Sequence, residues 1–558
     1  MAKKSKPNIK YNLIDILLFL TPFLYGLFPI WSLCLLGIVC VIGIIYKFSK
    51  EKRLLVPKGP KVYLLIIYLI SFLFTEFVAV DKGMNLLAFI KNIPILLFII
   101  LLAQYDNNEE EKNRHLYMVS ISSTISVLFS LFLMLIPNSG VYLDNRLHGI
   151  FYYANSYGLF LLVGAIILFL KKERKWYDYL MLAVLFVGII LTNSRAIIIM
   201  TLVFSIASLF FNKHRIKSAI SAIVCFIIMF IGAYFVFNME KRVSTEMLGS
   251  SEFISRIIYY EDSAKLISSH PLGLGYEGFW YEQAKEQTGI YDARFVHSSL
   301  IQVCLDVGII PAVVLIVLLF LIFFDKKQTA ISRIIMLAIL GHSLIDIDLE
   351  YIYFILIITL FMNNDTVVVA SKKIIYAVSV PLLCILSWIF LGDTLFYVKE
   401  YKTAIEIIPF HSDALQEVLY STSAKDEQLE YANKVLKYNQ NVSGAYEALR
   451  NKALEDNKFD EAISNEEKRL SLNKYKIDNY LSYTSLLTEA INYYNNNNEP
   501  EKAIDCVKKI VNIETSINNV LSNTNPLCFK TIHTPELDIP EELQSLIDYS
   551  KEILEKNT

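Results

Sequence analysis

Residues 176–211 read WYDYLMLAVLFVGIILTNSRAIIIMTLVFSIASLFF, and this stretch decides the fold class. It holds two apolar runs, 176–192 and 194–211, and each is close to the length that crosses a bilayer as an α-helix. Only the turn from Thr192 to Arg195 separates them. The stretch therefore predicts two antiparallel membrane helices joined by a very tight turn.

The rest of the chain extends this pattern. Hydrophobic residues make up 54% of the 558 residues, and the mean hydropathy is +0.44. The sequence thus predicts an all-α, polytopic helical membrane protein with about 12–14 transmembrane helices. The spans are expected at 13–28, 30–46, 61–79, 85–104, 115–136, 155–170, 176–192, 194–211, 217–237, 298–324, 332–345, 349–363 and 372–392.

Two domains follow from the change in composition near residue 394. Residues 1–393 form the predicted transmembrane domain, which includes a large polar loop at 239–296. Residues 394–558 are rich in Asn, Lys, Glu and Tyr and contain no run long enough to span. We expect them to fold as a separate helical domain.

The distribution of positive charge predicts the orientation. Most Lys and Arg residues lie in one set of alternate short connections, which begins with the N-terminus, whereas the other set holds Lys82, Arg146 and Arg195. Positive connections stay on the cytoplasmic side. The N-terminus is therefore predicted inside, and the loop and the C-terminal domain outside. The first span lacks a small-residue cleavage site and is expected to act as a signal anchor.

Charge and cysteine content exclude several classes of function. The formal net charge of −2 is unevenly divided, and the acidity of the C-terminal domain argues against a nucleic-acid partner. No cysteine or histidine cluster predicts a metal, although Cys506 and Cys528 could form a disulfide. The connections predicted inside lack a Gly-rich phosphate-binding loop, so any chemistry is expected outside.

Arg195 is a first candidate functional residue because a guanidinium between two spans is costly unless it is paired or solvated. One interpretation is that its side chain extends to the membrane interface. The other is an anion site, since a guanidinium suits a phosphate bidentately. Arg146 and Arg256 are candidates to complete that site, and Arg256 lies in a predicted amphipathic helix at 252–269 that could follow the membrane surface. A solvated charge on that helix is the alternative for Arg256.

His297 precedes a polar stripe on an otherwise apolar helix. Ser299, Gln302 and Asp306 recur at intervals of three and four, so the stripe is expected to face the protein interior or water. An interfacial histidine can act as a general base, but a histidine at a helix start can also be a simple cap. Nine residues separate Asp306 from His297, so we expect Asp306 to brace another helix.

Together these residues resemble the O-antigen ligase and polysaccharide polymerase family over roughly residues 10–390. The ordered segments are Arg146-x-His148-Gly with Tyr153-Ala-Asn155-Ser, Asn193-Ser-Arg195, Arg256-x-x-Tyr-Tyr260, His270-Pro-Leu-Gly273-Leu-Gly275, His297-Ser-Ser-Leu-Ile-Gln302 with Asp306, and His342-x-x-x-Asp346.

The resemblance implies a GT-C-like membrane glycosyltransferase of the bacterial cytoplasmic membrane that needs no metal or other cofactor. Its donor would be a glycan on undecaprenyl diphosphate, and its acceptor a glycan, lipid or protein hydroxyl. His297 would be the base, with Arg195 and Arg256 on the diphosphate. The expected substrate-binding residues are Arg146, His148, Asn155, His270, Gly273, Gly275, Arg294, Gln302, Asp306, His342 and Asp346.

Asp346 and Asp348 allow another hypothesis, because an Asp-x-Asp pair can hold a metal in sugar-transfer enzymes. A two-residue match is common by chance, and the pair is predicted outside, where nucleotide sugars are absent. The alternative is a short solvated loop in which His342 and Asp346 brace the site.

The C-terminal domain carries alanines that resemble degenerate tetratricopeptide repeats, at Ala432, Ala462 and Ala503. The unequal spacings leave two interpretations, a short helical solenoid with a protein partner or acceptor, and an irregular helical cap.

Other functions remain open from the sequence alone. A polysaccharide or lipid transporter would also have many spans and charges such as Lys91 within them, but it commonly shows internal repeats, which are absent here. A receptor or scaffold is a further alternative. Within the enzyme class, a polymerase, a ligase and a protein O-oligosaccharyltransferase are all compatible with these residues.

Overall fold

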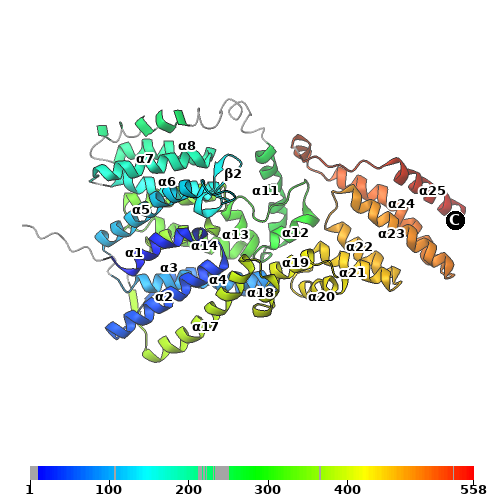
Figure 1. Cartoon of the computed structure of the whole chain (residues 1–558), viewed down its shortest axis with the longest axis horizontal. Coiled ribbons are helices and arrows are strands. Elements are labelled where there is room, and N and C mark those ends of the chain that lie inside the picture. Colours follow the sequence, from blue (N-terminus) through cyan, green and yellow to red (C-terminus); the bar gives the residue numbers. More distant parts are fainter. Residues whose placement is uncertain are drawn as a thin grey trace, which may run out of the picture.

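The computed structural model describes residues 11–557 except 106–107, 172, 212–215, 218–219, 221–222, 226, 230, 233–250, 364–365 and 532. A bundle of apolar helices forms one part of the molecule, and the C-terminal helices extend from one end of that bundle (Figure 1).

The bundle contains the predicted apolar segments as helices. Among the described residues, α2, α4, α5 and α17 are each long and apolar enough to cross a membrane, and the others are shorter apolar helices. The bounds are α1 Leu13–Leu20, α2 Ile30–Glu51, α3 Pro60–Thr75, α4 Lys82–Leu102, α5 Glu109–Leu133, α6 Ala154–Leu170, α7 Trp176–Thr192, α8 Arg195–Phe211, α13 Ser299–Val307, α14 Ile309–Phe323, α15 Ala330–Ser343, α16 Ile352–Thr359 and α17 Lys372–Tyr397. Most of the predicted ninth span, 217–237, lies outside the described residues.

Helix α6 lies at the centre of the bundle. It packs against α5, α7, α8 and α15, and nearly all of its residues are buried, including Tyr157 and Phe160. A helix that is apolar on every side belongs in a core or in lipid. The sequence NSYGLFLLVGAIILFL at 155–170 is therefore explained by burial within the protein.

One predicted span is broken. The sequence predicted a continuous helix at 298–324, but Gly308 ends α13 and begins α14 with φ 88° and ψ 174°. Only glycine readily adopts these angles. The loop at 270–275 supplies the reason for the break, because Leu274 and Gly275 donate to the carbonyls of Leu305 and Asp306, and Ile309 donates to that of Pro271.

The two ends of the bundle carry different residues. At the end we call the basic end, Lys61 pairs with Asp325, Lys112 donates to Asn363 at 2.6 Å, and strand β1 (Leu55–Lys58) pairs antiparallel with β4 (Thr366–Val369). The opposite end, called the docking end, carries Arg146, His297 and Asp346, and the C-terminal domain contacts it. This grouping agrees with the alternation of charge in the sequence. Which end faces the cytoplasm stays a prediction.

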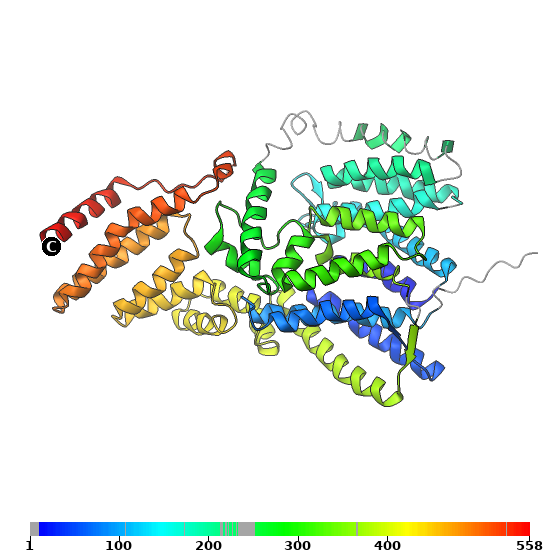
Figure 2. The same cartoon turned by 180° about the vertical axis from the view of Figure 1, so that it is seen from behind.

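Two helices cover the docking end. The part of the predicted loop at 239–250 lies outside the described residues, and α11 (Ser251–Ser269) and α12 (Gly278–Glu286) follow it. The predicted helix at 252–269 is thus present. Its buried residues include Ile254, Ile258 and Leu266. This helix stands between the bundle and the C-terminal domain in both views (Figures 1 and 2).

The C-terminal domain is a row of helices in which each packs on the next, from α18 to α25. Their bounds are α18 Tyr401–Ile407, α19 Ser412–Ser421, α20 Lys425–Val435, α21 Ser443–Glu455, α22 Phe459–Ser471, α23 Ile477–Asn496, α24 Pro500–Ser522, the short 3₁₀ helix η6 Pro526–Lys530 and α25 Glu541–Asn557. Ala432, Ala462 and Ala503 are buried between helices, where small residues allow close packing. Cys506 and Cys528 are free thiols, so the possible disulfide is not formed.

Gly308→Ala tests the break between α13 and α14. A Cβ at this position would lie 2.6 Å from backbone atoms of Pro271 and Leu272, and the backbone angles disfavour any side chain. We expect a loss of at least about 1–3 kcal/mol of stability, measured as a lower thermal unfolding midpoint by tryptophan fluorescence in detergent.

Gly341→Ala is the matched control. Nothing lies within 4 Å of a Cβ at Gly341, which is in the interior of α15. Alanine there is expected to leave the midpoint unchanged or raise it slightly. Equal midpoints for the two variants would contradict the account of the break.

Candidate functional site

The backbone around His297 is held from three sides. Ser298 is the N-cap of α13, so His297 lies just before the first turn of that helix. The Tyr260 hydroxyl of α11 donates to the His297 carbonyl, and Ser299 donates through both its amide and its hydroxyl to the Asp346 carbonyl, at 2.9 and 2.8 Å. The histidine is thus fixed between α11 and the segment that follows α15.

The His297 ring contacts a carboxylate and a phenol. Its Nδ1 is 3.3 Å from Asp346 Oδ1 and 3.2 Å from the Tyr153 hydroxyl, and that hydroxyl donates to the same carboxylate oxygen at 2.6 Å. The Tyr153 ring also stacks near the imidazole, with 6.5 Å between ring centroids. An imidazole held through Nδ1 beside a carboxylate keeps its Nε2 available as a proton acceptor. The His297 side chain is 29% exposed, so a substrate can reach it.

Asp346 is the most heavily bonded group of this cluster. Besides Tyr153, the side-chain amide of Asn155 donates to its Oδ2 at 2.6 Å, and the Ile347 amide donates to its Oδ1 at 2.9 Å. Burial raises the pKa of this carboxyl, but the hydrogen bond and charge of His297, with further help from Tyr153, bring the pKa well below its usual range. Asp346 is therefore an ionised, buried carboxylate at neutral pH.

Arg256 lies beside this carboxylate. It projects from α11, and its Nη1 donates weakly to the Ile345 carbonyl at 3.4 Å. Burial lowers the pKa of the guanidinium, but Asp346 and the neighbouring tyrosines together raise this pKa above its ordinary value. This bond is long and uses one of the five guanidinium N–H groups, so Arg256 has further donors that could bind an anion.

Arg195 and Arg146 meet at the turn between α7 and α8. Asn193 makes the turn in the left-handed conformation, and Arg195 begins α8 with its side chain half-buried. Arg146 Nε donates to the Thr192 carbonyl at 3.1 Å, and its Nη2 donates to Asn155, which in turn bonds Asp346. In the part of the chain that the structure describes, Arg195 forms no hydrogen bond or ion pair. Arg146 therefore has a bracing position, and Arg195 is the available cation.

Asp346 and Asp348 do not converge on one point. Asp346 faces His297, whereas Asp348 accepts from Ser156 at 2.8 Å and lies 2.6 Å from His342 Nδ1. The alternative of a solvated loop is wrong, because both aspartates are buried and paired within the bundle. His342 braces Asp348, and within the described residues it forms no hydrogen bond with Asp346. The arrangement offers no support for a metal held jointly by the two aspartates.

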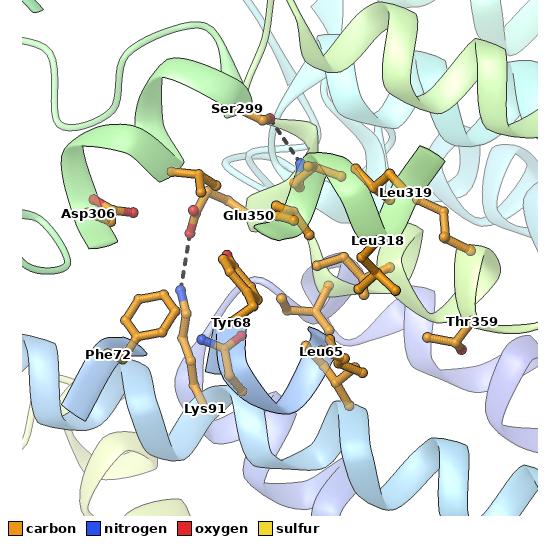
Figure 3. A pocket seen from close by; sticks show the side chains of 18 of the residues that line it. Leu65, Tyr68, Phe72, Lys91, Ser299, Asp306, Leu318, Leu319, Glu350 and Thr359 are labelled. Atoms are coloured by element: carbon orange, nitrogen blue, oxygen red, sulfur yellow. Dashed lines mark hydrogen bonds and ion pairs between the residues drawn. The ribbon is translucent and has the colours of Figure 1, made fainter. Parts of the chain in front are cut away.

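Gln302 and Asp306 point away from the histidine, as expected for residues further along α13. Gln302 donates to Asp306 at 2.8 Å and accepts from the Val296 amide at 2.8 Å. Asp306 lines a pocket between α3, α4, α14 and α16, next to the ion pair of Lys91 and Glu350 at 3.1 Å (Figure 3). The predicted polar stripe does face the interior.

This pocket is mostly apolar. Leu65, Leu318 and Leu319 are among the side chains around it, and the ion pair of Lys91 lies towards one side (Figure 3). Ser299, which bonds the Asp346 backbone, also lines it. The pocket therefore adjoins the histidine site.

The remaining candidates occupy other positions. Gly273 and Gly275 pack against the break between α13 and α14, where a Cβ would lie 2.7 Å from the Asp306 carbonyl oxygen and 2.6 Å from the Ala79 Cβ, respectively. His270 lies at the end of α11, with Nδ1 3.3 Å from the Leu266 carbonyl. His148 lies 3.3 Å from the Tyr152 carbonyl, and Arg294 pairs with Glu277 at 2.7 Å and with Asp413. Within the described residues, none of these five forms a hydrogen bond, ion pair or ring contact with His297.

Sequence reasoning missed the tyrosines of the site. Tyr153 bridges His297 and Asp346, Tyr260 bonds the His297 backbone, and the Tyr259 ring lies 6.0 Å from the imidazole. The polar pair Tyr153 and Asn155 at the start of the fully apolar α6 was the available signal.

Comparisons with known proteins bear on the same region. A search of curated proteins finds no match to the chain. A family model named Wzy_C, described as O-antigen ligase, matches residues 180–316, a segment that includes Arg195, Arg256 and His297. Residues 180–316 are thus similar to the O-antigen ligase family, and this match supports the resemblance that the sequence motifs carry.

Proposed function

We propose that this membrane enzyme transfers a glycan from undecaprenyl diphosphate to an acceptor hydroxyl at the outer face of a bacterial cytoplasmic membrane. The observation that carries the proposal is the contact of His297 Nδ1 with the ionised Asp346, beside Arg256. This arrangement supplies a base and a cation. The family match supports the same class of enzyme.

His297 takes the acceptor proton in this proposal. The acceptor oxygen attacks the anomeric carbon from the face opposite the diphosphate, the new C–O bond forms, and the proton moves to Nε2 of His297. Asp346 orients the ring and stabilises the imidazolium that results. The anomeric configuration is inverted in a single displacement.

The leaving group departs with the electron pair of the broken C–O bond. Negative charge then grows on the diphosphate, and Arg195 and Arg256 are the cations assigned to it. Arg195 suits this role because it has no partner within the described residues, and Arg256 because its bond to the Ile345 carbonyl is long. Arg146 is assigned a supporting role through Asn155.

The donor's polyprenyl tail needs an apolar location next to the reacting atoms. The pocket lined by Leu65, Leu318 and Leu319 adjoins Ser299 and meets that need. The Lys91–Glu350 pair balances its own charge there, so we assign the pocket to hydrocarbon and not to the diphosphate.

The acceptor distinguishes three versions of the enzyme. Purified protein supplied with a short undecaprenyl-diphosphate oligosaccharide is expected to yield a ladder of products, as a polysaccharide polymerase does. Transfer of one oligosaccharide to a second lipid would indicate a ligase. Transfer of one oligosaccharide to a peptide would indicate a protein O-oligosaccharyltransferase. Export of donor across a vesicle membrane without transfer would instead indicate a transporter and overturn the proposal.

His297→Ala is expected to reduce glycan transfer by about 10²–10⁴-fold, since the general base is lost. Asp346→Asn is expected to reduce it by roughly tenfold or more, because an amide stabilises an imidazolium less than a carboxylate does. Transfer rates are measured with purified protein at equal amounts. His533→Ala, at an exposed histidine of the C-terminal domain, is the control and should retain full activity. Full transfer by His297→Ala would refute the mechanism.

Arg195→Lys tests the diphosphate site without removing positive charge. Lysine lacks the planar fork that binds phosphate bidentately, so we expect about a tenfold loss of kcat/KM for the donor. The matched control is Arg53→Lys, an exposed arginine at the basic end of the bundle. Unchanged donor kinetics in Arg195→Lys would remove Arg195 from the proposed site.

Leu318→Trp fills the apolar pocket and tests the site for the tail. We expect a several-fold higher KM for a donor with a long polyprenyl chain and little change for a donor with a chain of two isoprene units. Leu321→Trp, on the exposed side of the same helix, is the control. An equal rise in KM for the long-chain and the short-chain donor would indicate damage to the fold and would contradict the assignment of the pocket.

A further inference from the structure

Helix α11 contacts the candidate site with one face and the C-terminal domain with another. Arg256, Tyr259 and Tyr260 point to the His297 site, as their contacts with Ile345, the His297 ring and the His297 carbonyl show. Ile254 and Ile258 lie on the other face and are buried against the C-terminal domain. The helix thus joins the candidate site to a domain that lies outside the membrane bundle (Figures 1 and 2).

The turn before η6 is the part of the C-terminal domain that holds this helix. The Asn525 side chain donates to Glu261 at 2.7 Å, and the Asn525 amide donates to the Thr288 carbonyl at 2.7 Å. Cys528 is only 1% exposed and packs with Ile254 and Ile258. Hydrogen bonds and buried apolar side chains therefore both hold α11 against the segment around η6.

Asp262 of α11 forms hydrogen bonds with the loop at 287–298, which connects α12 to α13. Its buried carboxylate accepts from the Thr288 amide and hydroxyl, both at 2.8 Å, and from the Tyr291 hydroxyl at 2.9 Å. This loop leads directly to His297. The position of α11 and the position of the loop are consequently coupled.

A second set of contacts joins the C-terminal domain to α12 and to Arg294 in this loop. Arg294 pairs with Asp413 of α19, and the Asn441 side chain donates to Glu282 of α12 at 2.6 Å. The Lys474 ammonium also donates to the Lys285 carbonyl at 2.7 Å. The C-terminal domain therefore contacts both α12 and the loop that follows it.

From these contacts we propose that the C-terminal domain positions the active site, with Asn525 and Cys528 as positioning residues that set Arg256 and His297 through α11. The inference rests on the proposed function of those two residues. It assigns the domain a role in the reaction itself, in addition to any partner that it binds.

The physical reason is the composition of α11. Leu266 packs in a cluster that includes Leu305 of α13, whereas Ile254 and Ile258 pack with Cys528 and Leu527 of the C-terminal domain and Tyr291 of the loop, so the bundle alone leaves these two isoleucines exposed to water. A reacting group displaced by about 1 Å loses roughly 10²-fold in rate. A small loosening of α11 would therefore lower activity well before it unfolded the protein.

Asn525→Ala is the first test, in the full-length enzyme. We expect kcat to fall by about tenfold, with the donor KM within about twofold. Asn523→Ala is the matched control, because Asn523 is exposed and bonds only its own helix at Asn519. Equal kcat values for the two variants would overturn the proposal, as would a loss confined to donor KM.

Gly289→Cys provides the second test, because a Cβ at Gly289 lies 3.4 Å from Cys528 Sγ, within reach of a disulfide. We expect mild oxidation to link the two residues, detected by mass spectrometry, and to restore kcat when Asn525→Ala is also present. Gly289→Ala is the control. Restored activity must disappear on reduction; a linked protein that stays slow would contradict the inference.

The two hypotheses fail in different ways. If the wild-type protein transfers no glycan, the proposed function fails, while the disulfide yield still reports whether the C-terminal domain docks on the loop. If wild-type transfer depends on His297 but Asn525→Ala and the linked variant match the wild type, only the positioning role fails.

Discussion

The buried carboxylate of Asp346 is the interaction on which the site depends. An ionised carboxylate away from water is stable only with several donors. Tyr153, Asn155 and the Ile347 amide provide them, and His297 adds its Nδ1 contact. Because these groups come from α6, from the start of α13 and from the segment after α15, satisfying one charge brings three distant parts of the chain together.

A second constraint acts through the break at Gly308. A continuous helix would leave no backbone groups for the loop at 270–275, whereas the break lets Leu274 and Gly275 bond the end of α13. Gly273 and Gly275, which were expected among the substrate-binding residues, are required for this backbone contact. The two glycines fix the position of the loop at 270–275, and this loop in turn fixes the position of the start of α13 next to α11.

Several residues of the site were predictable and others were not. His297, Arg195 and Arg256 stood out because charged or titratable side chains next to apolar spans are costly and therefore informative. Asp346 was expected to brace the site, but its direct contact with His297 joins residues 49 positions apart. Tyr153 was missed because a tyrosine at a helix start is common, and only its two polar partners reveal a role.

The sequence by itself determined the class of fold and the approximate spans, because hydrophobicity and helical periodicity are local properties of the chain. It also singled out the cations of the candidate site. The tertiary structure decided which cations are available, since Arg146 and Arg294 are engaged while Arg195 has no partner within the described residues. It also decided that the C-terminal domain holds α11. Such pairings join residues far apart in the chain, and no local pattern encodes which distant partner a buried charge will find.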